Sequence, residues 1–302
     1  MRAKLFKPLP DQGLLGLAWP ASPASEEELA PGLRVLEKLG YRTAWQPAAA
    51  GPMPYLAGQD EARAAELSRL MADPQVDGVI CGRGGYGSLR TAARLDFEAL
   101  AAAAKPLVGF SDVTVLLSGL LGRGGTAVHG PTVTNLADQS PASLARLASI
   151  LGGGWPRVKP LAGRPLSGRG RVRGFLAGGN LTILAHLAGT PWQPPTAGAI
   201  VFFEDKGEVL YRLDRCLSHL LAAGFFENCQ GVAVGRLDGV DYPQALAMIS
   251  HRLEALGLPL VAGLEFGHGP NNNALLVGGL AELDAEEGWL RPLDQEAAPA
   301  DD

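Results

Sequence analysis

A serine at position 111 stands where a short apolar run passes directly into a helical pattern, within residues 105–121 (KPLVGFSDVTVLLSGLL). A tight turn there would lift the hydroxyl clear of the backbone and place it at a helix N-terminus, which favours developing negative charge. This is the sequence form of a nucleophile elbow, although Val113 replaces the last glycine of the signature G-x-S-x-G. A Ser-Asp pair that opens a helix is more often a plain N-cap. Ser111 is therefore a candidate nucleophile whose partners must come from elsewhere in the chain.

A serine nucleophile needs a general base, most often histidine. The chain has five: His129, His186, His219, His251 and His268. We favour His268, because it has glycine on both sides and follows an apolar run, and flanking glycines let an imidazole approach another surface closely. His129, at the end of a predicted strand, is a plausible alternative. The orienting carboxylate could be Glu204, which ends the apolar run 199–204, but Asp205 and Glu208 compete with it and spacing does not decide.

The loop 81–87 (CGRGGYG) lies between a predicted strand and a predicted helix, and it contains G-x-G-x-x-G. A dinucleotide fingerprint also needs an acidic residue about 20 positions on, at the end of the next strand. Here the next strand ends in Phe110-Ser111 instead. Exposed N–H groups of such a turn could bind an anion or an oxyanion. Cys81 could be a nucleophile placed at a strand end or a small packing residue.

The elements that must position these residues alternate along the first half of the chain. The patterns predict strands at 13–19, 42–45, 76–81 and 106–110, and helices at 26–39, 60–71, 86–95 and 112–121. This alternation is typical of a parallel sheet covered by helices. After a stretch rich in Pro, Gly and Arg, helices at 175–189 and 211–224 and strands at 199–204, 231–237 and 259–266 follow in mixed order. We predict an α/β protein with an N-terminal nucleophile domain (1–139), a linker (140–170) and a smaller mixed α+β C-terminal domain (171–302) that carries the acid and base.

Composition limits the classes of function. The chain has 302 residues, 47% of them hydrophobic, which is enough for a large core. A net charge of −5 without a dense basic run argues against nucleic acid as a partner. Three scattered cysteines, Cys81, Cys216 and Cys229, fit a reducing compartment better than a disulfide framework or a zinc cluster. The first residues make a poor signal peptide and no apolar stretch is long enough to span a membrane, so we expect a cytoplasmic protein with no membrane partner.

Five groups of segments, in this order, resemble the serine L,D-carboxypeptidases (muramoyltetrapeptide carboxypeptidases), a family that includes microcin-immunity hydrolases. The groups are 83–87 (RGGYG); 109–114 (GFSDVT) with 129–131 (HGP); 178–182 (GGNLT) with 189–191 (GTP); 202–205 (FFED) with Tyr211 and Asp214-Arg215; and 267–268 (GH). They cover roughly residues 80 to 270. The chain departs from the family at Trp19-Pro20-Ala21-Ser22, where the family has an Ala-Pro-Ser turn, and at Pro270-Asn271-Asn272-Asn273. Both departures could reshape the substrate pocket.

The resemblance implies that Ser111 is the nucleophile, Glu204 the orienting acid and His268 the general base. The backbone N–H groups of Gly84, Gly85 and Asp112 would form the oxyanion hole. The implied fold is a flavodoxin-like N-terminal domain and a smaller C-terminal domain, usually in a homodimer, with the triad split between the domains and with no metal or other cofactor.

The implied reaction is hydrolysis of the bond to a C-terminal D-alanine of a murein tetrapeptide, in cell-wall recycling, through an acyl-enzyme on Ser111. Arg83, Tyr86 and Asn180 are expected to bind substrate, Arg83 at the terminal carboxylate. Two alternatives stay open. One is a microcin-type hydrolase of peptide-nucleotides from the same family. The other is a dinucleotide- or anion-binding protein that uses the loop from Gly82 to Gly87.

Overall fold

Two β-sheets organise the computed structural model, which describes residues 3–49, 51 and 53–295. The first sheet contains β1 (Leu14–Ala18), β2 (Arg42–Ala44), β3 (Gly78–Cys81), β4 (Leu107–Gly109), β5 (Ala127–His129) and β12 (Leu275–Val277). Its order is β12-β5-β4-β3-β1-β2, and all pairs are parallel except that of β12 with β5. The order from β2 to β5 is that of flavodoxin-like folds. The prediction of a parallel-sheet N-terminal half is confirmed.

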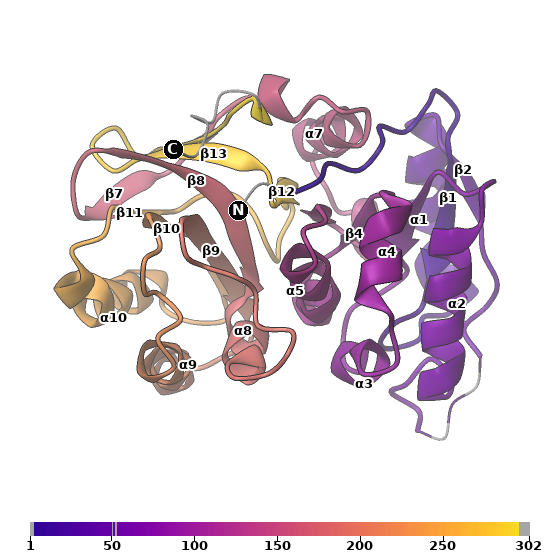
Figure 1. The fold of residues 1–302 in the computed structure, drawn as a ribbon, viewed down its shortest axis with the longest axis horizontal. Helices are drawn as coiled ribbons and strands as arrows, with labels where there is room; N and C mark the ends of the chain where they lie inside the picture. The colour runs from indigo at the N-terminus through magenta and orange to yellow at the C-terminus, as the bar shows by residue number, and fades with distance from the viewer. Residues whose placement is uncertain (1–2, 50, 52, 296–302) are drawn as a thin grey trace.

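Helices cover this first sheet and connect it to the second half of the chain. They are α1 (Glu26–Lys38), α2 (Asp60–Ala72), α3 (Ser88–Ala92), α4 (Phe97–Ala103), η1 (Ser111–Val113), α5 (Thr114–Gly122), α6 (Val133–Leu136), α7 (Pro141–Leu151) and η2 (Trp155–Arg157). The α1 helix begins with a capping box, in which the Ser25 hydroxyl accepts from Glu28 N–H and the Glu28 carboxylate accepts from Ser25 N–H. In Figure 1, α5 lies between the N-terminal half and the C-terminal half.

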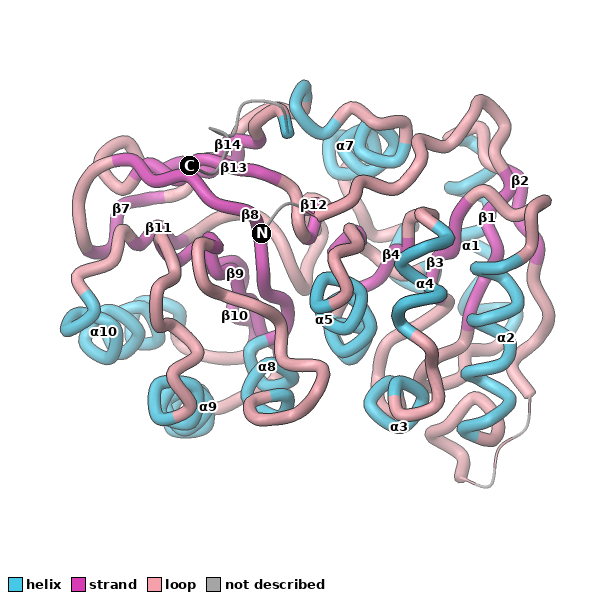
Figure 2. The backbone as a smooth tube through the Cα atoms, viewed as in Figure 1, coloured by secondary structure: helices cyan, strands magenta, loops and turns pink. Residues whose placement is uncertain are grey.

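The second sheet is mixed. It contains β6 (Leu161–Ala162), β7 (Arg164–Ser167), β8 (Arg171–Asn180), β9 (Ala199–Lys206), β10 (Gly231–Asp238), β11 (Leu260–Ala262), β13 (Leu280–Asp284) and β14 (Trp289–Pro292). Its order is β6-β14-β13-β8-β9-β10-β11-β7, with a parallel centre from β8 to β11. The accompanying helices are α8 (Leu181–Leu187), α9 (Leu210–Ala222), α10 (Tyr242–Leu253) and η3 (Glu254–Leu256). Figure 2 shows α8, α9 and α10 together on one side of these strands, which confirms the mixed architecture.

The alternation of side chains along β9 joins the two halves of the protein. Ile200 and Phe202 belong to the apolar core that extends into the N-terminal sheet, whereas Val201 and Phe203 belong to the core formed with α8, α9 and α10. Successive side chains of a strand point to opposite faces. The even-numbered residues of β9 therefore face the N-terminal half.

The helix predicted over 175–189 is wrong in its first part. Residues from Phe175 to Asn180 pair with β9 as the end of β8, and the helix begins only at Leu181. At Gly178 the neighbouring strand comes so close that a Cβ would lie 1.8 Å from the carbonyl oxygen of Phe202. Glycine here serves close strand packing, which the apolar periodicity of the segment does not reveal.

The segment 140–170 has regular structure of its own. It forms α7, β6 and β7, of which β7 pairs with β11 and β6 with β14. Conversely, β12 comes from the C-terminal half of the chain but pairs with β5 of the first sheet. The boundaries at 139 and 170 therefore stay a prediction, and α10 and the strands from β12 to β14 are elements that the sequence patterns did not predict. Within the described ranges, no helix combines the length and apolarity needed to cross a bilayer.

Candidate active site

The turn between β4 and α5 holds Ser111 in a strained conformation. Its φ is +60°, in the left-handed region that non-glycine residues rarely occupy. Such a conformation costs about 1–3 kcal/mol and is found mainly at functional sites. Phe110, rather than Ser111, occupies the N-cap position, and no side chain caps this helix end. The plain N-cap interpretation of Ser111 is therefore wrong.

The glycine that opens this turn explains why valine is tolerated two residues after the serine. A Cβ on Gly109 would lie 2.7 Å from Cγ1 of Val113. The absence of a side chain at Gly109 thus makes room for Val113, which is fully buried. Of the two glycines of the signature G-x-S-x-G, the chain keeps only the one on the strand side of the turn.

His268 is bound to Glu204. The distance from Nδ1 of His268 to Oε2 of Glu204 is 2.6 Å, and the His268 backbone N–H donates to the same oxygen at 3.1 Å. A carboxylate only accepts, so Nδ1 carries the proton and Nε2 is left as the basic nitrogen. Gly267, at φ +93°, permits this approach, since a Cβ there would lie 2.5 Å from Cβ of Glu204. The close approach predicted from the flanking glycines is confirmed.

Glu204 is fully buried, and two partners stabilise its charge. Burial by itself would raise the pKa of Glu204, but the hydrogen bond and the charge of His268 lower it below the usual value. The Nδ2 amide of Asn180 donates to Oε1 of Glu204 at 3.3 Å. The arrangement keeps Glu204 ionised and orients the imidazole of His268.

The competing carboxylates are engaged elsewhere. Asp205 points to the opposite face of β9, where its Oδ2 accepts from the Thr182 N–H and hydroxyl at 2.9 and 2.7 Å. Burial raises the pKa of Asp205. Glu208 lies 3.6 Å from Nη1 of Arg212. Neither contacts His268.

Ser111 and His268 line the same cavity, of about 530 Å³, which also contains Gly84 and Gly85. The aromatic ring of Phe110 lies against the imidazole of His268, with 4.7 Å between the ring centroids. Among the described residues, the Ser111 hydroxyl and His268 form no hydrogen bond. Catalytic hydrogen bonds are often long without substrate and tighten in the complex. The structure therefore brings the nucleophile candidate and the base candidate to one cavity from the two halves of the chain.

The glycine loop lies directly beside Ser111. A Cβ on Gly84 would lie 3.3 Å from Cβ of Ser111. Gly85, at φ +101°, forms no hydrogen bond within the described part of the chain, so its N–H is available to a ligand. Asp112 is buried, burial raises the pKa of its carboxyl group, and its Oδ2 accepts from Ser88 N–H at 2.8 Å. Gly84, Gly85 and Asp112 thus lie around the Ser111 hydroxyl or next to it in sequence.

Packing accounts for the glycines that resemble a dinucleotide fingerprint. A Cβ on Gly82 would lie 2.6 Å from the Trp19 ring, and one on Gly87 would lie 2.9 Å from Cδ2 of Leu56. At Gly85, which stands between the glycines of that pattern, a Cβ would lie 2.4 Å from Oγ of Ser22. Ser22 also donates to Tyr55 O at 2.8 Å and accepts from Tyr86 N–H at 3.1 Å. The segment that departs from the family's early turn therefore supports the glycine loop. The helix that follows the loop, α3, has only five residues, which is a poor match to the long helix of a dinucleotide site.

Two other nucleophile or base candidates are buried. Cys81 has no exposed surface, does not line the cavity, and has a thiol pKa raised by burial. His129 is also fully buried, and burial lowers its pKa to about 4. Its ring lies among those of Phe110, Phe202 and Phe266, and neither ring nitrogen has a hydrogen-bond partner in the described residues. His129 is thus a neutral imidazole behind the site.

The loop that carries His268 is held by residues that the sequence did not suggest. Oδ1 of Asn272 accepts from Gly267 N–H at 3.0 Å, and the Asn272 N–H donates to Oε1 of Gln139 at 2.8 Å. Nε2 of Gln139 also donates to Gly269 O at 3.1 Å. The unfamiliar run after the histidine therefore joins this loop to the N-terminal half. The only signal in the sequence was the departure from the family pattern.

The predicted substrate-binding residues differ in their placement. Arg83 lines the cavity, with its Nη1 2.8 Å from Oε1 of Glu28. Tyr86 is half exposed and packs edge-on against Tyr55, outside the cavity lining. The Asn180 side chain is buried and bonded to Glu204 and Asp205. Residues that line the cavity without having been predicted are Glu28, Thr134, Asn135 and Lys206.

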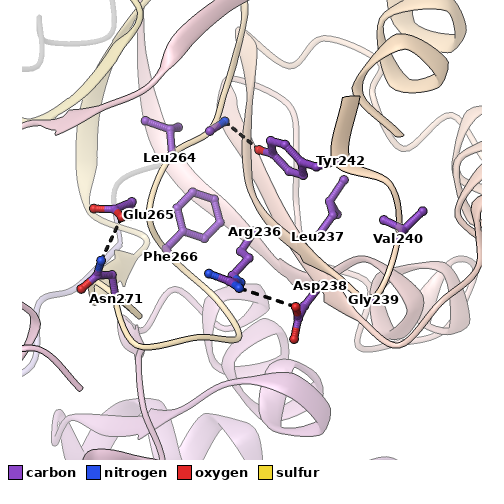
Figure 3. Close-up of a pocket in the computed structure, with 11 residues that line it drawn as sticks. Arg236, Leu237, Asp238, Gly239, Val240, Tyr242, Leu264, Glu265, Phe266 and Asn271 are labelled. Carbon is purple, nitrogen blue, oxygen red and sulfur yellow. Dashed lines mark hydrogen bonds and ion pairs between the residues drawn. The ribbon is translucent and has the colours of Figure 1, made fainter. Parts of the chain in front are cut away.

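A second cavity, of about 370 Å³, is lined by residues of the segments 236–242 and 263–266 and by Asn271 (Figure 3). Arg236 and Asp238 form an ion pair in it at 3.6 Å, and Asn271 donates to Glu265 at 2.9 Å. The described part of the chain contains no cluster of three or more His, Cys, Asp or Glu side chains suited to a metal ion.

Known proteins with this fold include peptidases. Residues 15–130 match the family model of the LD-carboxypeptidase N-terminal domain, and residues 173–283 match that of the LD-carboxypeptidase C-terminal domain. The chain is 35% identical over 298 residues to the murein tetrapeptide carboxypeptidase of Pseudomonas aeruginosa, covering 91% of this chain and 94% of that one. The crystal structure of muramoyltetrapeptide carboxypeptidase from Oxalobacter formigenes superposes with a TM-score of 0.81 at 30% identity, covering 92% and 97% of the two chains. The microcin C7 self-immunity protein MccF superposes with a TM-score of 0.85 over 98% of this chain and 100% of that one, but at 20% identity, which supports the shared fold alone.

Proposed function

The chain belongs to the LD-carboxypeptidase family, as its motifs predicted, and we propose that it is a serine L,D-carboxypeptidase that hydrolyses the bond to a C-terminal D-alanine of a murein tetrapeptide. The observation that carries this proposal is the cavity lined by both Ser111 and His268, in which His268 is bound to the buried Glu204 at 2.6 Å. The strained φ of Ser111 supports it, because such strain is rarely kept without function.

In the proposed reaction, Nε2 of His268 removes the proton from the Ser111 hydroxyl as its oxygen attacks the peptide carbonyl carbon. Glu204 stabilises the imidazolium that forms. His268 then passes the proton to the amine of the leaving D-alanine, the C–N bond breaks, and the acyl group stays on Ser111 as an ester. A water molecule, deprotonated by His268, hydrolyses this ester and restores the serine.

The negative charge on the carbonyl oxygen needs N–H donors. Gly84, Gly85 and Asp112 are proposed to supply them, since the glycine turn lies against Ser111 and Asp112 follows it at the start of a helix. A single donor of this kind contributes typically 10²–10³-fold to the rate. Ser22 would fix the turn through its hydrogen bond with Tyr86 N–H.

Release of D-alanine from a murein tetrapeptide by the full-length protein tests the proposal. Ser111→Ala and His268→Ala should each lower kcat by many orders of magnitude, up to about a million-fold, with unchanged far-UV circular dichroism. Cys81→Ala is the matched control and should keep kcat. Full activity in Ser111→Ala would exclude the serine mechanism, and loss in Cys81→Ala alone would favour the cysteine.

The second candidate is hydrolysis of a microcin-type peptide-nucleotide, which the shared fold with MccF keeps open. Parallel assays with both substrates distinguish the two, because the preferred substrate should have the higher kcat/KM.

We propose that the enzyme acts on cell-wall peptides in cytoplasmic recycling, and as a homodimer. Sedimentation velocity at several concentrations tests the dimer.

A further inference from the structure

Two cationic side chains line the cavity that contains Ser111, one from each half of the protein. Arg83, beside the glycine turn, has its Nη1 2.8 Å from Oε1 of Glu28. Glu28 lines the same cavity, so the negative charge of Glu28 neutralises the positive charge of Arg83 there. Arg83 is therefore poorly suited to neutralise a substrate carboxylate without losing its existing partner.

Lys206 lines the same cavity from the C-terminal half, and its ionic partner is more distant than that of Arg83. Its Nζ is 3.8 Å from Oδ2 of Asp238, and the other oxygen of Asp238 is 3.6 Å from Nη2 of Arg236. Figure 3 shows this second ion pair. One carboxylate is thus shared by two cations, Lys206 and Arg236, so Asp238 neutralises the charge of Lys206 only in part. Because 57% of the Lys206 side chain is exposed, the ammonium group can turn toward a ligand.

Strand geometry places Lys206 on the side of the general base. Glu204 and Lys206 are two residues apart on β9, so their side chains leave the strand on the same face. That face is also the face of Phe202, which contacts the N-terminal half, whereas Asp205 points to the other side. The ammonium group therefore lies on the wall that holds His268.

The chemistry of peptide hydrolysis requires the leaving group on this same wall. The imidazole of His268 must reach the amine nitrogen of the leaving amino acid to protonate it. In a C-terminal residue the carboxylate is only two bonds from that nitrogen. The free carboxylate must therefore lie close to His268, away from the glycine turn that receives the carbonyl oxygen.

We propose that Lys206 binds the terminal carboxylate of the substrate, so that it is the residue that makes this enzyme a carboxypeptidase. This assignment rests on the proposed function. It replaces Arg83 in that role and leaves the Glu28–Arg83 pair to contact a more distant part of the peptide. An ammonium group offers three donors and forms charge-assisted hydrogen bonds with carboxylates.

The test compares two substrates, a peptide ending in D-alanine and the same peptide ending in D-alanine amide, which lacks the terminal charge. The measured quantity is the ratio of kcat/KM for the acid to that for the amide. In the wild type this ratio should be about 10- to 100-fold, as expected for a hydrogen bond between charged groups. In Lys206→Met the ratio should fall toward one, and Lys206→Arg should keep most of it. Lys38→Met, which removes an exposed charge at the far end of α1, should keep the full ratio.

The outcomes separate this proposal from the one on which it rests. A full ratio in Lys206→Met would overturn the role of Lys206, and collapse of the ratio in Arg83→Met alone would return the role to Arg83. In both cases wild-type release of D-alanine would still support the carboxypeptidase. If the wild type cleaves neither peptide, the proposed function fails and the assignment of Lys206 fails with it.

Discussion

The hydroxyl oxygen of Thr114 accepts a hydrogen bond from the backbone N–H of Asn180 at 3.0 Å, which joins the helix behind Ser111 to the strand that leads to the C-terminal half. The contact is buried and tight. A Cβ on Gly179 would lie only 2.4 Å from Cγ2 of Thr114. Asn180 in turn donates a hydrogen bond to Glu204. Through Asn180, the position of the turn that carries Ser111 is therefore coupled to the position of Glu204.

Thr114→Val should lower the free energy of unfolding by about 1–3 kcal/mol, because it leaves the Asn180 N–H buried without an acceptor. Thr114→Ser, which keeps the hydroxyl, is the matched control and should cost less. Urea denaturation of both variants measures the difference. A Thr114→Val variant as stable as Thr114→Ser would show that the hydrogen bond contributes nothing measurable.

Glu204→Gln should lower kcat by about 10³–10⁴-fold. The amide is neutral, so it neither selects the tautomer with a proton on Nδ1 of His268 nor stabilises the imidazolium. Glu208→Gln, which changes a nearby carboxylate that does not contact His268, should keep kcat within twofold. Steady-state release of D-alanine measures both. Equal losses in the two variants would contradict the role given to Glu204.

Ser22→Ala should lower kcat about tenfold with little change in KM, a part of the effect of removing a whole oxyanion donor. The variant loses the bonds to Tyr55 O and Tyr86 N–H that fix the glycine turn, so the Gly85 N–H is no longer held in place. Ser218→Ala, on α9, is the control and should leave kcat unchanged. If Ser22→Ala raises KM alone, the turn contributes to binding and not to the transition state.

His129 should make the protein less stable as the pH falls from about 6.5 to 4. Burial lowers the pKa of His129 to about 4 in the folded protein, whereas the ordinary value is 6.5. In this window the unfolded chain binds a proton that the folded protein does not, so unfolding is favoured by up to about 3 kcal/mol at the acid end. His129→Leu should remove this part of the pH dependence.

Urea midpoints of the wild type and His129→Leu at several pH values between 7 and 4 measure this difference. Glu204, whose pKa lies below its usual value, stays ionised through most of the window. Parallel stability curves for the two proteins would contradict a neutral His129. The variant also tests whether the aromatic surroundings of the ring tolerate an apolar side chain, since Leu should pack between Phe110, Phe202 and Phe266.

Much of the fold could be read from local patterns. The apolar runs of β3, β4, β9, β10 and β11 and the amphipathic helices between them predicted a parallel sheet and a second mixed domain. The patterns failed where long-range pairing decides the structure. Residues 175–180 read as helix because of their small and apolar side chains, but they pair with β9. The short strands β12, β13 and β14 carry little signal of their own: β12 pairs with β5 and β13 with β8, both distant in sequence, and only the pairing of β13 with β14 is local.

By itself, the sequence determined the candidate nucleophile, base and acid and the glycine turn, because residue type and local spacing limit what each segment can do. Local spacing left Glu204 and Asp205 open and the family resemblance favoured Glu204; the tertiary structure supplies the physical reason, because the face of β9 that carries Glu204 meets a histidine 64 positions away. Only the tertiary structure joined Gln139 to Asn272, 133 positions apart, and brought Lys206 and the Glu28–Arg83 pair to one cavity. These relationships rest on hydrogen bonds and packing between distant segments, and no local pattern in a single chain encodes them.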